Sequence, residues 1–308
     1  MASICVLGSA GFLGSHLVNA LAGSGHHVVA VDREVPLART TSEDAVEYVT
    51  ADYSDASATR GPLSRCAVAI HLVSTTSPAD RGPDITSDTT SNVVPTLRLL
   101  ETCVDAGVER VLFASTGGAI YGPQGRERYA EDDPALPVSP YAIGKLAIER
   151  YLEHFSVEYG LRHTVFRVSN PYGPGQRLVR GQGLIPALFG SVLSGRPMTV
   201  YGDGSMTRDY VYVGDVARAV TTLASREPRH AIYNIGSGIG ETVLAIVDAA
   251  RAVTGRAIPV EHAAAPSSFV DRVVLDVGRF VDEFEPISTV ELTDGLSETW
   301  DWAQHAYG

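Results

Sequence analysis

The sequence has one lysine, Lys145, although 24 of its side chains are lysine or arginine. Its three cysteines, Cys5, Cys66 and Cys103, are isolated and odd in number, so they cannot form a full disulfide framework, and they suit a reducing compartment. No apolar run reaches the ~20 residues that a membrane helix needs. The first residues lack the positive segment of a signal peptide. We therefore expect a cytoplasmic protein without a membrane span.

Metal ligands in recognisable patterns are also missing. The nine histidines form no HxxxH or HxH pattern and have no cysteine partners, so we expect no metal site. The formal net charge is -12, which disfavours nucleic acid and anionic membranes as partners because both attract basic surfaces. This net charge is compatible with a small anionic ligand, since a few arginines can hold one.

The first half of the chain alternates short β-branched runs with helical patterns. Strands are predicted at 4–8, 26–32, 46–52, 67–74 and 108–116, and helices at 11–25, 91–107 and 141–160. This alternation predicts an α/β fold with a doubly wound parallel sheet of the Rossmann type.

The pattern changes after residue 166, where glycine and proline become frequent and the elements become shorter. We predict a first domain over 1–166, rejoined by segments near 209–236, and a smaller mixed α/β domain over 167–308. The run AIYNIGSG, at 231–238, is one segment that can return a strand to the main sheet.

Three glycines between the first strand and the first helix suggest a dinucleotide site. Gly8, Gly11 and Gly14 form a G-x-x-G-x-x-G pattern, in which a turn without side chains lets a pyrophosphate approach the helix N-terminus. The second strand ends in Asp32, 18 residues after Gly14, where a carboxylate can accept the ribose hydroxyls. This favours NAD over NADP, although the neighbouring Arg33 could accommodate a 2′-phosphate.

Asp52 follows the third predicted strand. Its carboxylate could accept a hydrogen bond from the adenine amino group, or it could be a solvated carboxylate at a strand end. The pattern does not separate these two interpretations.

The lone lysine lies four residues after a tyrosine. Tyr141 and Lys145 therefore share one face of a predicted helix. A phenol has a pKa of about 10, and a nearby ammonium together with a positive nicotinamide ring would lower it. We expect this pair to move a proton. The fifth strand ends in Ser115 and Thr116, and the carboxyl ends of parallel strands are where ligands bind.

Taken together, these segments resemble the extended short-chain dehydrogenase/reductase superfamily. The resemblance is to its NAD-dependent nucleotide-sugar epimerase/dehydratase family, on the epimerase side, and it covers nearly the whole chain. The motifs that carry it are GSAGFLG, AVAIHLVS, SNVVPTLRLLE, FASTGGAIYG, SPYAIGK, RVSNPYGPGQ, VYGDGSMTRDYVYVGDVA, YNIGSG and DRVVLDVGR.

The resemblance implies roles for particular residues. Tyr141 would be the acid/base, Lys145 would hold the nicotinamide ribose, and Thr116, with Ser115 as the alternative, would be the assisting hydroxyl. The other implied residues at the NAD site are Gly8, Gly11, Phe12, Leu13, Gly14, Asp32, Arg33, Asp52, Tyr53, Leu72, Val73 and Asn92.

Substrate contacts are implied in the second domain. Asn170, Arg208 and Arg272 would hold the phosphates or the sugar of a nucleotide sugar. One position departs from the family, because Gly183 stands where many relatives have an asparagine that contacts the nucleotide phosphate.

The resemblance also limits which reactions of the family are expected for this chain. Relatives that are dehydratases or decarboxylases carry acids after the catalytic hydroxyl, where this chain has Gly117 and Gly118. The expected activity is therefore an NAD-dependent 4-epimerase, with a UDP-hexose as the expected substrate. A 4-ketoreductase of a deoxy-sugar nucleotide and a non-catalytic NAD-binding regulator are the alternatives. The family often dimerises through two helices, here Asn92 to Gly107 and Tyr141 to Gly160, so we expect a homodimer.

Overall fold

The structure is a computed structural model that describes residues 3–34, 43–76, 86–178, 183–265, 270–284, 286 and 290–308. The chain divides into two compact units. Unit 1 comprises Met1–Thr116, Ser139–Arg167 and Ala217–Tyr233, and unit 2 comprises Gly117–Val138, Val168–Val216 and Asn234–Gly308. The prediction placed Gly117–Val138 in the first domain, whereas this stretch belongs to unit 2. The segment that returns to unit 1 is Ala217–Tyr233, which lies within the predicted 209–236.

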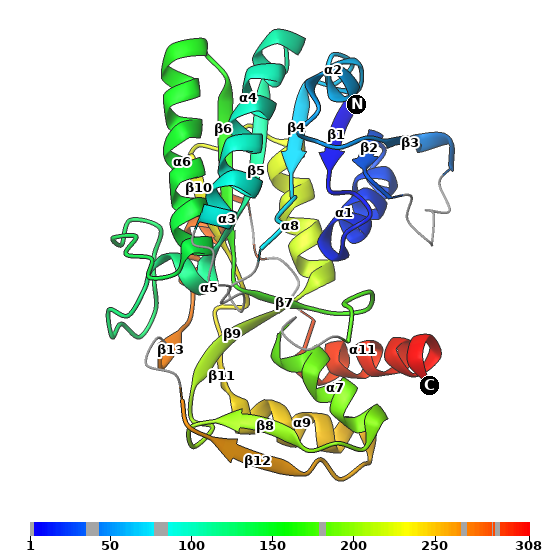
Figure 1. The fold of residues 1–308 in the computed structure, drawn as a ribbon, viewed down its shortest axis with the longest axis vertical. Coiled ribbons are helices and arrows are strands. Elements are labelled where there is room, and N and C mark those ends of the chain that lie inside the picture. The colour runs from blue at the N-terminus through cyan, green and yellow to red at the C-terminus, as the bar shows by residue number, and fades with distance from the viewer. Residues whose placement is uncertain are drawn as a thin grey trace. The chain divides into compact units, whose positions relative to one another are not determined.

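A seven-stranded sheet forms the centre of unit 1, with the strand order β10-β6-β5-β4-β1-β2-β3 (Figure 1). The strands are β1 (Ser3–Leu7), β2 (His27–Asp32), β3 (Val46–Thr50), β4 (Val68–His71), β5 (Arg110–Thr116), β6 (Arg162–Val168) and β10 (Ile232–Ile235). Neighbours from β3 to β5 pair in parallel. The predicted doubly wound α/β fold is confirmed, including the late strand that returns to this sheet.

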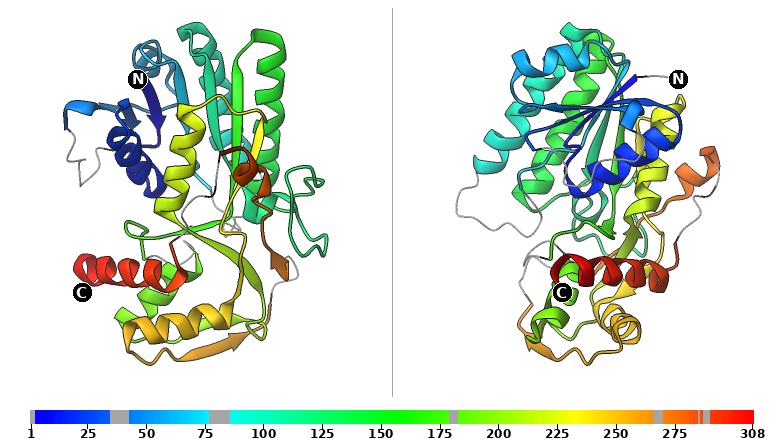
Figure 2. Two further views of the ribbon diagram at one scale, coloured as in Figure 1. Left: turned by 180° about the vertical axis from the view of Figure 1, so that it is seen from behind. Right: turned by 90° about the vertical axis from the view of Figure 1, so that its right-hand side faces the viewer.

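Helices cover both faces of this sheet. They are α1 (Phe12–Gly23), α2 (Ala56–Leu63), α3 (Thr86–Asp88), α4 (Val94–Ala106), α6 (Pro140–Tyr159) and α8 (Val213–Ser225), with a 3₁₀ turn at Glu43–Ala45 and a π-helical turn, η2, at Thr89–Val93. Seen along the sheet edge, α1 and α8 lie on one face, and α2, α4 and α6 lie on the other (Figure 2). Parallel strands are buried on both faces for this reason, and their β-branched residues form the core.

Local sequence explains where α6, the longest of these helices, begins and ends. Ser139 caps its start, since the serine Oγ accepts the backbone N–H of Ala142 at 3.3 Å, and Pro140 occupies the first helical position. Gly160 ends the helix with a φ of +71°, a left-handed conformation that glycine adopts without strain. The serine cap and Pro140 thereby fix the start of the helix, which is the end that carries Tyr141 and Lys145.

Unit 2 contains a four-stranded sheet, a two-stranded sheet and several helices. Its strands are β7 (Asn170–Tyr172), β8 (Met198–Tyr201), β9 (Thr207–Tyr212), β11 (Gly240–Thr242), β12 (Val260–Ala263) and β13 (Arg272–Val273), and its helices are α5 (Gly117–Ile120), α7 (Leu184–Ser194), α9 (Val243–Thr254), α10 (Gly278–Phe284) and α11 (Leu292–Tyr307). The helices α7, α9 and α11 pack on one another around a core of their own, in which the rings of Phe189 and Trp300 lie 5.4 Å apart.

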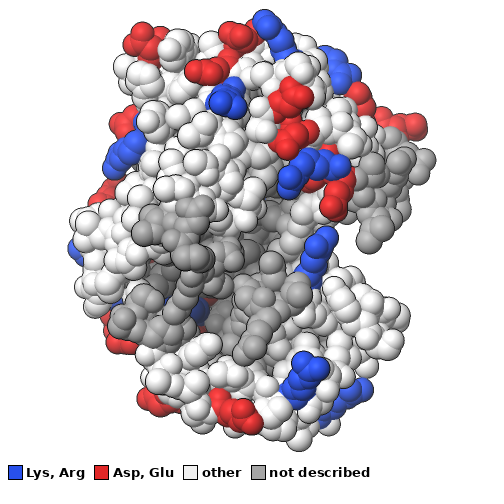
Figure 3. Space-filling view, viewed as in Figure 1, with Lys and Arg blue, Asp and Glu red and all other residues white. Residues whose placement is uncertain are grey.

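Charged side chains are spread over the surface. On the face drawn in Figure 3, basic side chains are scattered and do not gather into one continuous patch. Among the described residues, no helix is both long enough and apolar enough to span a membrane. The same part of the chain contains no group of three or more histidine, cysteine, aspartate or glutamate side chains that could hold a metal ion.

Candidate active site

The turn between β1 and α1 is built for close backbone packing. Gly8 has a φ of +89°, which favours glycine, and its carbonyl oxygen lies 2.0 Å from the point that a Cβ on Gly14 would occupy. Any larger residue at Gly14 would push the helix away from the turn. Beside this turn, the Oγ of Ser9 is buried, and no described residue is its hydrogen-bond partner. A bare turn at a helix N-terminus with a buried hydroxyl fits the pyrophosphate of a dinucleotide.

Asp32 connects this turn to the end of β2. Its Oδ2 accepts the backbone N–H of Ala10 at 2.9 Å, and its Oδ1 accepts the N–H of Arg33 at 2.7 Å. The carboxylate thus holds the glycine turn in place and puts a negative charge beside it. That charge suits the ribose hydroxyls of NAD and opposes a 2′-phosphate.

Most of the remaining predicted cofactor residues lie just after β2, β3 or β4 or at the start of α1, and Asn92 lies in η2. Phe12 and Leu13 are the first two residues of α1 and are half-buried. Leu72 and Val73 follow β4 and lie against Gly8, with the backbone nitrogen of Val73 3.2 Å from the Cβ position of that glycine. The carboxyl ends of β1, β2 and β4 therefore meet, as in a parallel sheet that binds a ligand at this edge.

Asp52, Tyr53 and Asn92 already have partners in the protein. Asp52 accepts both the N–H and the Oγ–H of Ser54, and these bonds lower the pKa of its carboxyl group. Tyr53 donates its hydroxyl to the carbonyl of Ser91 at 3.2 Å. Asn92 lies in the π-helical turn, and its Oδ1 accepts the N–H of Thr75 at 2.8 Å. These contacts order the loops around the turn, and they favour the strand-end interpretation of the Asp52 side chain.

Tyr141 and Lys145 lie on the same face of α6. The Nζ of Lys145 donates to the carbonyl oxygen of Ala114 on β5 at 2.9 Å, and it lies 5.8 Å from the centre of the Tyr141 ring. The lysine side chain is buried. The helix therefore brings the lone ammonium beside the phenol, at the carboxyl end of β5.

Burial dominates the pKa values of both members of the pair in the protein side chains by themselves. Burial is the largest effect on Tyr141 and raises its pKa to about 12, while a hydrogen bond with Thr116 lowers it and the charge of Asp88 raises it. Burial also lowers the pKa of Lys145 to about 8, against the opposing charges of Asp88 and Glu149. In the protein side chains by themselves, loss of solvation is therefore the dominant effect on the tyrosine pKa. The expected lowering counted the nicotinamide ring together with the lysine, and it stays a prediction for the NAD-bound enzyme.

Ser115 and Thr116 point to opposite sides of β5, as successive residues of a strand do. Thr116 hydrogen-bonds with Tyr141, whereas Ser115 donates its Oγ–H to Glu149 at 2.5 Å. The carboxylate of Glu149 also forms a buried ion pair with Arg167, at 2.7 Å. Of the two predicted hydroxyls, Thr116 is the one beside the tyrosine.

Three residues near the pair were missed by sequence reasoning. Asp88 and Glu149 act electrostatically on Lys145, and His71 is fully buried between the rings of Tyr53 and Phe113. Glu149 could have been found, because it lies four residues after Lys145 and so extends the same helix face. No local pattern connects Asp88 or His71 with α6.

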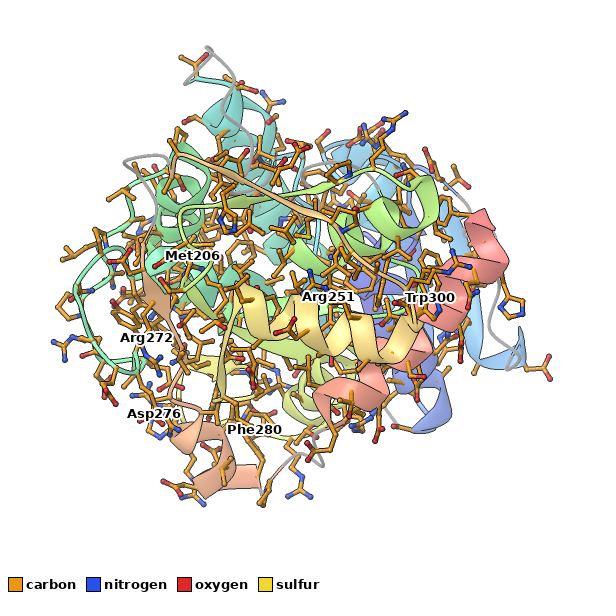
Figure 4. The ribbon with its side chains drawn as sticks, turned by 90° about the horizontal axis from the view of Figure 1, so that it is seen from below. Met206, Arg251, Arg272, Asp276, Phe280 and Trp300 are labelled. Carbon is orange, nitrogen blue, oxygen red and sulfur yellow. The ribbon has the colours of Figure 1, made fainter. Side chains whose placement is uncertain are left out.

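The predicted substrate residues lie together on one sheet of unit 2. Arg208 is on β9, and its neighbours in the sheet carry Asn170, on β7, and Arg272, on β13. Asn170 donates its Nδ2 to the carbonyl of Asp209 at 2.8 Å, and Arg208 donates to the sulfur of Met206. Figure 4 labels Arg272 and Met206 in this unit. The register pairs Arg272 with Thr207 and Arg208 with Val273, so the two arginine side chains leave opposite faces of the sheet, and their strand positions do not by themselves bring the guanidinium groups together.

Gly183, the position that departs from the family, has a backbone reason to be glycine. It precedes α7 with a φ of +119° and a ψ of 172°, a region that only glycine adopts without strain. An asparagine at this position would need a different approach of the chain to the helix.

Comparisons with known proteins agree with this geometry. The model of the NAD dependent epimerase/dehydratase family matches residues 4–236. A UDP-glucose 4-epimerase of Mycolicibacterium smegmatis is 38% identical over 241 residues, which cover 76% of this chain and 77% of that protein. The crystal structure of Thermus thermophilus UDP-glucose 4-epimerase in complex with NAD superposes with a TM-score of 0.87 at 34% identity, and the match covers 99% of both chains.

The matches also include enzymes with other activities. A dTDP-4-dehydro-6-deoxyglucose reductase of Escherichia coli is 27% identical, with 96% of this chain and 95% of that protein covered. The shared family is thus broader than one reaction. Because the family model matches the chain from the first strand to the last strand of the seven-stranded sheet, the chain belongs to the NAD dependent epimerase/dehydratase family, a family of enzymes whose cofactor is NAD.

Proposed function

We propose that the protein is an NAD-dependent 4-epimerase of a nucleotide sugar, with a UDP-hexose as substrate. The observation that carries the proposal is the grouping of Thr116, Tyr141 and Lys145 at the carboxyl end of β5, in the same unit as the glycine turn and Asp32. The positions after Thr116 are Gly117 and Gly118, which offer no acid for a dehydration. The relatives named UDP-glucose 4-epimerase support the choice of nucleotide.

The protein side chains handle one proton in this reaction. The glycine turn and Asp32 would hold NAD, which would supply hydride transfer at C4 of the sugar and the positive charge of its ring. Tyr141 takes the proton from the sugar O4 and gives it back after the sugar has turned. Thr116 hydrogen-bonds with Tyr141 and can also bond the reacting oxygen. Lys145 supplies positive charge that favours the phenolate form.

Arginines of unit 2 would hold the nucleotide. Burial lowers the pKa of Arg208. Arginine guanidinium groups stay charged in proteins, so Arg208 can bind an anion. Arg272 is exposed, and its Nε donates to the carbonyl of Glu127 at 3.0 Å. The remaining guanidinium N–H groups can meet diphosphate oxygens, while Asn170 contributes a polar contact to the sugar.

The proposal includes a homodimer formed through α4 and α6. On α6, Ile143, Tyr151 and Val157 are 52%, 41% and 84% exposed, and Val94 of α4 is 39% exposed. Apolar side chains on two neighbouring helices favour association of copies. Sedimentation analysis would show a dimer mass, and a monomer at micromolar concentration would contradict this part. A cytoplasmic location is supported by the three cysteines, all of which are free and buried.

A 4-ketoreductase is the second candidate, and Arg33 is the residue that favours it, because an arginine beside Asp32 can bind NADPH. The two functions differ in their use of cofactor. An epimerase regenerates NAD in each cycle, whereas a reductase consumes reduced cofactor in proportion to product.

The absorbance of reduced nicotinamide during turnover separates the two candidates. We expect UDP-galactose to be converted without net change in this absorbance. Steady loss of absorbance with a 4-keto deoxy-sugar nucleotide, and no conversion of UDP-hexoses, would replace the epimerase with the reductase.

A further inference from the structure

The ammonium group of Lys145 is buried in a place that does little to neutralise it. Lys145 is 5% exposed, and its Nζ contacts the carbonyl of Ala114 at 2.9 Å and the ring of Phe113, whose centre is 4.7 Å away. A carbonyl and an aromatic ring attract a cation, but neither carries a compensating charge. A buried ammonium without a counter-charge tends to lose its proton.

Most titratable groups that face Lys145 cannot serve as that counter-charge. His71 of β4 is kept neutral by burial, which lowers its pKa to about 3. Glu149, on α6 itself, is paired with Arg167 of β6 and also accepts the hydroxyl of Ser115, so its charge is already balanced. The phenol of Tyr141 is protonated in the protein, because burial raises its pKa to about 12.

Asp88, at the end of α3, is the remaining group. It is 6% exposed, and its Oδ1 accepts hydrogen bonds from the hydroxyl of Thr76 and from Nδ2 of Asn92, the latter at 3.0 Å. Both of these hydrogen-bond donors, a hydroxyl and an amide, are neutral groups. The carboxylate is therefore buried and hydrogen-bonded, yet among the described residues it has no cation of its own in contact.

The second oxygen of Asp88 reaches the backbone of α6. Its Oδ2 lies 1.9 Å from the point that a Cβ on Gly144 would occupy. Gly144 immediately precedes Lys145 and follows Tyr141 by three residues, so the carboxylate lies against the helix beside both catalytic side chains. Only a residue without a side chain allows this approach.

We propose that Asp88 is the counter-charge of Lys145, a positioning residue whose carboxylate keeps the buried lysine protonated beside Tyr141. Gly144 has no side chain, and this allows the carboxylate of Asp88 to lie against the backbone of α6 next to Lys145. The catalytic meaning of this charge rests on the proposed function, but the charge balance does not depend on which sugar the enzyme takes. The same negative charge also raises the pKa of Tyr141, whereas the positive charge that Asp88 maintains on Lys145 favours the phenolate.

The lone lysine makes a direct test available. Protein labelled with [ε-¹³C]lysine has a single lysine signal, and its chemical shift reports the protonation of Lys145 in the NAD-loaded enzyme. In Asp88→Asn, which keeps the size of the side chain, we expect the midpoint of this titration to fall by about 1 pH unit, because an opposing charge has been removed. The matched control is Asp105→Asn on α4, whose carboxylate is exposed and whose midpoint should equal that of the wild type.

A second variant tests whether the close approach of Asp88 to Gly144 is required. Gly144→Ala places a methyl group where Oδ2 lies and must displace the carboxylate, so the midpoint should fall in the same direction. The control is Gly61→Ala in α2, where an added Cβ meets nothing within 4 Å. If folded Asp88→Asn or Gly144→Ala protein titrates with the wild-type midpoint, the proposal is wrong. Failure of the wild type to convert any sugar would count against the proposed function and would leave this titration unchanged.

Discussion

Replacing Tyr141 by phenylalanine should lower kcat by about 10²- to 10⁴-fold, the range expected when a general acid–base group is removed. The change deletes one hydroxyl and keeps the ring, so the helix and its contacts should persist. The hydroxyl is the group that Thr116 contacts, and it is the one through which the proposed reaction moves the O4 proton. NAD should still bind, since the glycine turn and Asp32 are unchanged.

The matched control for this variant is on the same helix. Tyr151→Phe removes a hydroxyl from a side chain that is 41% exposed on α6, and its activity should stay within about twofold of the wild type. The measurement is the initial rate of sugar conversion at saturating substrate, together with NAD binding by calorimetry. Near-normal turnover in Tyr141→Phe would rule out the proposed acid–base role.

Replacing Arg167 by methionine should reduce the free energy of unfolding by about 3–5 kcal/mol, because it leaves a buried carboxylate without its cation. In the wild type, Arg167 donates to both oxygens of Glu149, at 3.1 Å and 2.7 Å, and both side chains are less than 5% exposed. Ser115 also donates to this carboxylate. The pair therefore ties α6 to β5 and β6 directly behind Lys145.

Two further variants make the interpretation specific. Arg150→Met on the same helix removes an ion pair with Glu153 that is exposed on both sides, and it should change stability by less than about 1 kcal/mol. The double variant Glu149→Met with Arg167→Met should recover most of the loss, since both charges are gone. Urea denaturation followed by circular dichroism gives these values. A loss in Arg167→Met no larger than in Arg150→Met would show that the buried pair does not stabilise the fold.

Much of unit 1 could be predicted because its signals are local. The buried strands are short runs rich in valine, isoleucine and alanine. The glycine turn and the cap at Ser139 are each formed by residues that are close together in the sequence. The pairing of Tyr141 with Lys145 follows from helical spacing alone. These features need no knowledge of distant contacts, so periodicity and turn chemistry were sufficient to place them.

The excursion of Gly117–Val138 into unit 2 could not be predicted in this way. It is decided by contacts with residues more than 100 positions away. The backbone N–H of Tyr129 donates to the carbonyl of Val274, and the carbonyl of Tyr129 accepts a hydrogen bond from Nδ2 of Asn234. No periodic pattern in the loop records those partners. The loop sequence contains only the turn residues that allow such an excursion.

The protonation states of Tyr141 and Lys145 also could not be predicted from local sequence patterns. The expectation of a lowered tyrosine pKa considered the lysine and the nicotinamide ring but not the loss of water around the phenol, and in the protein side chains by themselves burial is the dominant effect. Asp88 was missed for a related reason. Its contact with α6 depends on a glycine in a distant segment, and a glycine inside a helix gives no sign of what it lies against.

The central claim, that this protein inverts a nucleotide sugar at C4 with NAD that it regenerates, is tested most directly by proton NMR. The purified protein is incubated, without added cofactor and again with NAD, with UDP-glucose, UDP-galactose and their N-acetyl and uronic acid forms. The account predicts a new anomeric signal for one epimeric pair, with the same final ratio whichever member is supplied. No change in any of these sugars, with NAD present and the protein folded, would contradict it.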